Sequence, residues 1–82
     1  MSILKAVKKL QVEVTDLLEI QTDIGIDIAR LTRAKLKCDP KDLQAFENSI
    51  QRLKDSVNDI TDQISTKMKK INQMIKDSEE TK

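Results

Sequence analysis

Residues 38–42 read Cys38-Asp39-Pro40-Lys41-Asp42 and form the one strong helix break in this 82-residue chain. A residue that precedes proline is disfavoured in helical dihedrals, so a helix should end before Asp39. Asp39 suits the N-cap of a second helix, Pro40 suits its first turn, and Asp42 suits a reciprocal capping position. The break therefore predicts one domain over residues 1–82, with helices at about 2–36 and 40–76, a turn at 37–39 and a frayed tail at 77–82.

The segment after the break repeats apolar residues with the period of a heptad. Its a and d positions are Leu43, Phe46, Ile50, Leu53, Val57, Ile60, Ile64, Lys67, Ile71 and Met74. Such a narrow apolar stripe is typical of a coiled-coil helix that packs on one neighbour. Lys67 alone interrupts the stripe, and we expect the adjacent Met68 to take its place.

The segment before the break has a heptad too, but its apolar surface is wider. Its a and d positions are Ile3, Val7, Leu10, Val14, Leu17, Gln21, Ile24, Ile28 and Leu31. Further apolar residues flank this stripe at e, f and g positions, namely Leu4, Ala6, Val12, Leu18, Ile20, Ile26 and Ala34. One partner helix cannot cover such a surface, so we expect the first helix to be the inner helix of a larger bundle.

A short connection folds long helices back on one another. The sequence thus predicts an all-α fold, a long antiparallel two-helix coiled-coil hairpin that dimerises into a four-helix bundle. A turn at 37–39 leaves the register open between two arrangements, with Ile28 near Phe46 or near Ile50. Residues 10–14 and 24–28 alternate apolar and polar side chains as strands do, but the helical heptad continues through both runs.

Several kinds of active site are excluded by the residues that the chain lacks. It has no histidine, one cysteine and one aromatic residue. A zinc site or a Cys–His pair therefore cannot be assembled within one chain. The acidic residues fall mostly at solvent-facing positions, and no glycine-rich phosphate loop is present. We expect no enzyme activity, no cofactor, no metal site and no small-molecule substrate.

The cysteine count also bears on location. A single cysteine cannot form an internal disulfide, which favours a reducing, cytoplasmic or other intracellular environment. We interpret Cys38 as an incidental loop thiol, with a crosslink between subunits as the alternative. No apolar run exceeds two residues, whereas a membrane span needs about 20, so we expect no membrane-spanning helix.

Charge is arranged in bands along the predicted hairpin, although the net charge is only +1. Residues 13–27 and 51–65, which are expected to lie side by side, contain eight acidic and two basic residues, a net charge of −6. The open end, residues 1–12 and 66–82, has a net charge of +5, and the loop end, residues 28–50, has +2. Such banding orients association more than it strengthens it.

These features predict a structural or protein–protein interaction module that self-associates as a homodimer, or docks on another helical protein in a coiled-coil assembly. Gln21 is polar at an a position in the middle of the first helix, where it would meet its own copy if two such helices crossed antiparallel. Gly25, one turn away, would let the two backbones approach. The residues predicted for self-association are Leu4, Leu18, Ile20, Gln21, Gly25 and Ile26.

The alternative is a small regulatory binder that acts on RNA, or inhibits a protein target, through an exposed helical face. The plasmid-encoded regulator Rop is built from two paired hairpins, and its likeness to this chain is one of architecture alone. Nucleic-acid binding has weak support here because stacking aromatic residues are missing. Contacts to phosphate or to an acidic partner are predicted for the lysines Lys5, Lys8, Lys9, Lys67, Lys69 and Lys70.

Overall fold

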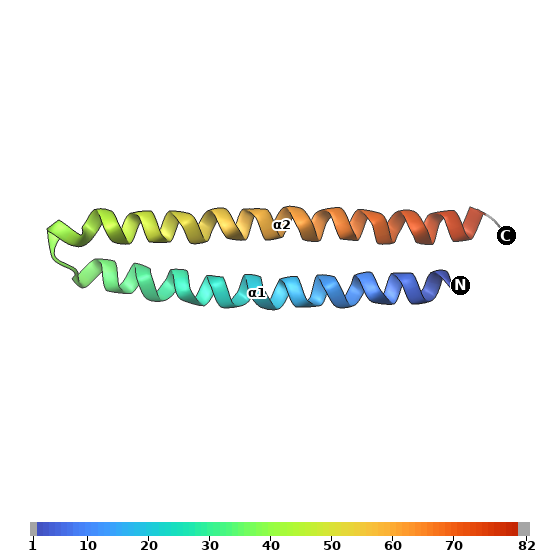
Figure 1. Cartoon of the computed structure of the whole chain (residues 1–82), viewed down its shortest axis with the longest axis horizontal. Coiled ribbons are helices and arrows are strands. Elements are labelled where there is room, and N and C mark those ends of the chain that lie inside the picture. The colour runs from blue at the N-terminus through green and yellow to red at the C-terminus, as the bar shows by residue number, and fades with distance from the viewer. Residues whose placement is uncertain (1, 81–82) are drawn as a thin grey trace.

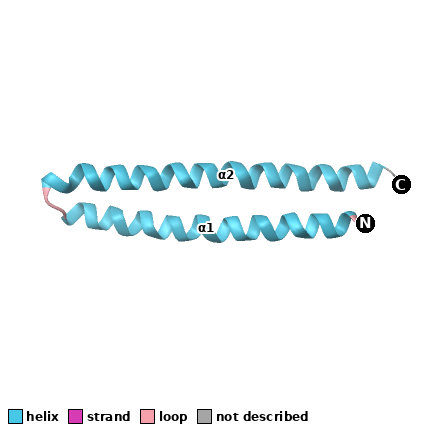
Figure 2. Ribbon diagram, viewed as in Figure 1, coloured by secondary structure: helices cyan, strands magenta, loops and turns pink. Residues whose placement is uncertain are grey.

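The computed structural model describes residues 2–80, in which two long helices run antiparallel (Figure 1). Helix α1 spans Ile3–Lys37, the short 3-10 helix η1 spans Pro40–Asp42, and α2 spans Leu43–Glu80. The molecule measures 65 × 15 × 14 Å, and the start of α1 lies beside the end of α2. The described part is helical except at its start and in the loop (Figure 2), so the hairpin prediction is confirmed and neither alternating run is a strand.

The chain reverses direction at the predicted break, over residues 38–42, where the turn was expected at residues 37–39. Cys38 and Asp39 are extended, with ψ angles of 160° and 147°. Pro40–Asp42 then forms the 3-10 turn, in which the Asp42 N–H donates to the Asp39 carbonyl at 2.9 Å. Asp39 holds the N-cap position, but its side chain accepts no capping hydrogen bond. The turn is therefore set by extended backbone and by Pro40, without the expected side-chain cap.

The outer ends of the helices also differ from expectation. Ser2 caps α1, because its hydroxyl accepts a hydrogen bond from the Leu4 N–H at 3.1 Å. Helix α2 continues to Glu80, past its expected end at residue 76. Residues 81 and 82 of the expected tail lie outside the described residues.

The two apolar stripes pack on each other along the hairpin. Val7, Ile50 and Ile60 are buried, and the other a and d residues are half-buried, apart from Ile3 and Leu43 at the two ends of the seam. Lys67 keeps its place in this seam and Met68 is exposed, so the expected exchange between them is wrong. Because two helices enclose only one row of contacts, the core is thin and the apolar flanks stay uncovered.

Three pairs of side chains report the alignment of the helices: Gln21 with Thr61, Glu13 with Lys67, and Lys35 with Glu47. Either expected register would have placed Gln21 opposite residues near 53–57, whereas its partner is Thr61, so α2 is displaced along α1 from both expected registers. The reason lies in the loop. The reversal extends over residues 38–42 and not only over the expected residues 37–39, which moves α2 along α1.

Candidate interaction surface

Two long flanks border the seam, and they differ in composition. One flank contains the e positions of both helices, which are Leu4, Gln11, Leu18, Gly25 and Thr32 of α1 and Glu47, Lys54, Thr61, Met68 and Ile75 of α2. We call it the groove side, because two shallow grooves that share Gln11 and Ile75 hollow its open half. The flank with the g positions is called the opposite side.

The open half of the groove side is apolar. Leu4 and Leu18 of α1 and Met68 and Ile75 of α2 are all exposed there. Of the ten exposed large apolar residues within residues 2–80, five lie at e or b positions on the groove side, and Val12 and Ile26 lie at f positions on the outer surface. The larger groove has a volume of about 490 Å³ and is lined by Gln11, Val14, Thr15, Met68, Ile71, Asn72 and Ile75.

The opposite side is polar. Within the described residues, Ile20 is the only exposed large apolar residue at a g position. The g positions of α2 are Ser49, Ser56, Gln63, Lys70 and Asp77. Toward the open end, the Lys67 ammonium lies 3.4 Å from the Glu13 carboxylate, in a hollow also lined by Lys9 and Lys70. Leu18 and Ile20, both predicted for self-association, therefore lie on different flanks.

Gln21 contacts the other helix of its own hairpin. Its Nε2 donates to the Thr61 hydroxyl at 2.7 Å, and that hydroxyl donates onward to the Val57 carbonyl at 2.9 Å. The side chain is half-buried in the seam. The contact to a second copy that was predicted for Gln21 finds no support in this geometry, because the amide is already bonded within the chain.

Gly25 and Ile26 lie beyond the grooves, toward the loop. A Cβ built on Gly25 would have no atom within 4 Å, so the residue borders open space. Ile26 is exposed at an f position, on the outer surface next to the groove side. The open space expected beside Gly25 is therefore present. The exposed apolar residues that α2 contributes to the groove side, Met68 and Ile75, lie nearer the open end and do not border this space.

The six predicted lysines do not form one cluster. Lys9, Lys67 and Lys70 line the hollow on the opposite side, where Lys67 pairs with Glu13. Lys8 lines the second groove, on the groove side. The remaining two, Lys5 and Lys69, are exposed at f positions of different helices.

The observed register also changes the charge bands. Residues 13–27 lie beside about 55–69, and these segments contain eight acidic residues and two lysines, so the net charge of the band is still −6. The open end, residues 1–12 and 70–82, now has +3, and the loop end, residues 28–54, has +4. Within α1, residues 13–27 contain five acidic residues and no basic one.

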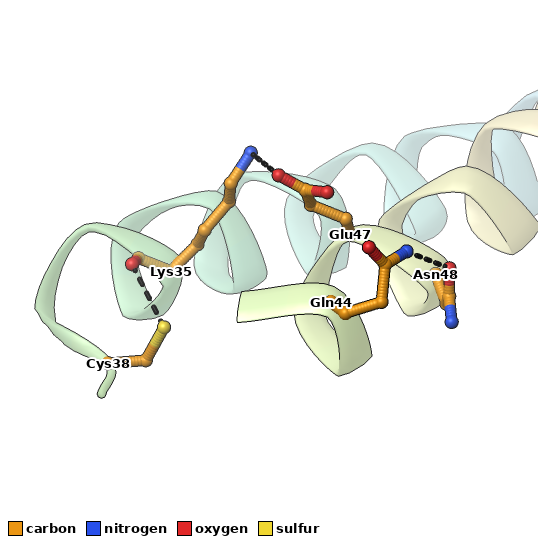
Figure 3. A network of polar contacts seen from close by, with 5 residues as sticks. All are labelled: Lys35, Cys38, Gln44, Glu47 and Asn48. Carbon is orange, nitrogen blue, oxygen red and sulfur yellow. Dashed lines mark hydrogen bonds and ion pairs between the residues drawn. The ribbon is translucent and has the colours of Figure 1, made fainter. Parts of the chain in front are cut away.

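Several polar contacts lie near the loop end of the hairpin (Figure 3). The Lys35 ammonium reaches across to the Glu47 carboxylate at 3.3 Å, and the Gln44 amide donates to Asn48 at 2.8 Å. The half-buried Cys38 thiol donates to the Lys35 carbonyl at 3.2 Å. The Cys38 thiol thus supplies a hydrogen bond to a carbonyl in the last turn of α1.

No three His, Cys, Asp or Glu side chains among residues 2–80 are grouped so that they could hold a metal ion. Neither α1 nor α2, as described, has a stretch long and apolar enough to cross a bilayer.

Sequence reasoning missed half of the apolar surface. Leu4 and Leu18 were predicted, but their neighbours Met68 and Ile75 were not. The signal was present, because Met68 and Ile75 stand seven residues apart at e positions of the heptad.

Comparison of the chain with protein-family models, with curated proteins and with solved structures finds no match.

Proposed function

We propose that this chain is a non-enzymatic interaction module that packs its groove side against other helices, in the first place those of a second copy, to form a four-helix bundle. The observation that carries the proposal is the alignment of Leu4 and Leu18 of α1 with Met68 and Ile75 of α2 on one flank. Apolar flanks beside a coiled-coil seam are the usual means by which helix pairs build larger bundles.

The exposed area supports the same proposal. The chain exposes 6509 Å², whereas a compact monomer of 9.4 kDa exposes about 5,000 Å². The excess of about 1,500 Å² exceeds the area of about 800 Å² that each partner contributes to a standard interface. With only three buried apolar residues in the described part, the hairpin also has a thin core of its own, and association would add to it.

The regulatory-binder alternative has less support. It depends on the lysines of the open end acting together, but these side chains are divided between the two flanks and the outer surfaces. Lys67, which is half-buried in the seam, is paired with Glu13. No observation favours this function over helix packing.

The test compares two matched variants by light scattering over a wide range of concentration. Leu18 and Ile20 are equally exposed on α1, at 46% and 47%, but lie on different flanks. A lysine placed in an apolar interface must be desolvated, so Leu18→Lys should raise the dissociation constant of the dimer by about 100-fold or more. Ile20→Lys should leave the dimer intact, and circular dichroism should show equal helix content in both.

Two results would overturn the proposal. One is a wild-type chain that stays monomeric at every concentration. The other is an Ile20→Lys variant that dissociates as readily as Leu18→Lys, which would show that the flanks are equivalent.

A further inference from the structure

On the exposed face of α1, apolar and charged residues are placed symmetrically about one point of the helix. At the e positions, Leu4 and Leu18 are equally far from Gln11. At the f positions, Lys5 and Glu19 are equally far from Val12. A helix that packs antiparallel on a copy of itself, with its centre between Gln11 and Val12, would therefore place leucine on leucine and lysine beside glutamate.

The exposed face of α2 has its centre at the same level of the hairpin. Met68 and Ile75 are equally far from the midpoint between Ile71 and Asn72. In the structure, Gln11 lines the same groove as Ile71 and Asn72. One two-fold axis across the groove side can therefore pass through the centres of both patterns.

Resting on the proposed function, we infer that the partner is a second copy of the chain, packed antiparallel about this axis so that only the open halves overlap. In this dimer α1 lies on the partner's α1 and α2 lies on the partner's α2. Leu4 meets the partner's Leu18, and Met68 meets the partner's Ile75. The two Gln11 side chains face each other at the axis, where their amides can hydrogen-bond.

The charges select this arrangement over the two others that a two-fold axis allows. A parallel dimer would place α1 on the partner's α2 at the same level, and therefore the acidic band of each copy on that of the other. Full antiparallel overlap, centred at Gln21, would also superpose the two bands, each with a net charge of −6. The offset dimer moves the bands apart and pairs Lys5 with the partner's Glu19 twice.

One like-charge contact remains in the offset dimer, and the two-fold axis makes it occur twice. Lys69 of each copy approaches the partner's Lys76 at the rim of the contact between the two α2 helices. Both are exposed and have long, flexible side chains, so they can separate into solvent at little cost.

The offset gives the dimer a distinctive shape. Overlap of about 22 residues corresponds to about 33 Å of helix, so two hairpins of 65 Å would form a rod of about 100 Å. Full overlap would keep the length near that of one hairpin. Small-angle X-ray scattering of the wild-type chain measures this dimension directly.

A crosslinking experiment locates the axis. In a Cys38→Ser background, Gln11→Cys should form a disulfide-linked dimer on mild oxidation, because the two copies meet there. Gly25→Cys is the matched control, since it occupies the same row of e positions but lies outside the overlap. A dimer crosslinked through Gly25→Cys and not through Gln11→Cys would overturn the inference.

Charge reversal tests the orientation independently. Lys5→Glu alone and Glu19→Lys alone should each weaken the dimer by about 10-fold at low salt, because both symmetry-related pairs become repulsive. Mixing the two variants should restore a heterodimer, in which both pairs attract again. Failure of the mixture to associate more tightly than either variant would overturn the antiparallel arrangement.

These outcomes separate the inference from the proposed function. If Leu18→Lys dissociates the dimer but the crosslinking or the charge reversal fails, the groove side is the interface and the arrangement is wrong. If the wild-type chain is monomeric, both the function and the arrangement are wrong.

Discussion

Leu18 and Ile20 stand two residues apart on α1 and are equally exposed, yet they lie on flanks of different character. Leu18 belongs to the flank to which α2 adds Met68 and Ile75. Beside Ile20, α2 contributes serines, Gln63 and a lysine. The comparison teaches that exposure of one apolar side chain says little by itself, since isolated examples are ordinary on protein surfaces. An interface is indicated where both helices present apolar residues to the same flank.

The largest expected effect contrasts the seam with the opposite side. Ile60 is buried between the helices, whereas Ile20 faces solvent. Ile60→Ala should lower the free energy of unfolding by about 2–4 kcal/mol, because it removes buried methyl groups and leaves a cavity. Ile20→Ala should change it by less than about 0.5 kcal/mol. Urea unfolding followed by circular dichroism measures both.

That contrast would break if Ile20→Ala were also strongly destabilising. The opposite side would then be packed against something, and its description as a solvent-facing flank would be wrong. A small effect at both positions would instead mean that the seam contributes little to folding.

The seam itself could be predicted from the sequence because it depends on spacing alone. Residues such as Ile50 and Ile60 recur at a and d positions, and a helix brings those positions to one face whatever its partner does. Leu4 and Leu18 were found in the same way, as apolar residues in excess of one seam.

The register could not be predicted because the apolar pattern does not select it. Sliding one helix by a heptad keeps a and d residues facing each other, so the choice depends on the loop and on specific polar contacts. The extended backbone at Asp39 and the 3-10 turn at Pro40–Asp42 determine the loop. Gln21 finds its partner in Thr61 only in the resulting register.

A moderate effect is expected where the groove side meets the seam, at Gln21. Gln21→Leu should raise the free energy of unfolding by about 1 kcal/mol, since the gain from apolar burial exceeds the net worth of one hydrogen bond. No group is left unpaired, because the Thr61 hydroxyl still donates to the Val57 carbonyl. Thermal unfolding at a fixed protein concentration measures the change.

Gln21→Ala is the matched control for that prediction. It removes the same hydrogen bond without adding apolar surface, so it should lower the stability. If Gln21→Leu also lowered it, the contact with Thr61 would be the stronger term, and this part of the groove side would be held by polar contacts.

The smallest expected effect sharpens the contrast between the open half of the groove side, where a second copy is inferred, and the half nearer the loop. Gly25 lies in the latter, and a methyl group added there meets no atom within 4 Å. Gly25→Ala should therefore raise the free energy of unfolding by about 0.5–1 kcal/mol, because alanine loses less backbone entropy on forming a helix. Ala29→Gly, one turn further along the same exposed surface, should lower it by a similar amount, and the double variant should match the wild type. The dissociation constant of the dimer should not change in any of the three, since both positions lie outside the inferred overlap. A Gly25→Ala variant with weakened dimerisation would place the second copy against Gly25, and the two halves of the groove side would then belong to one interface.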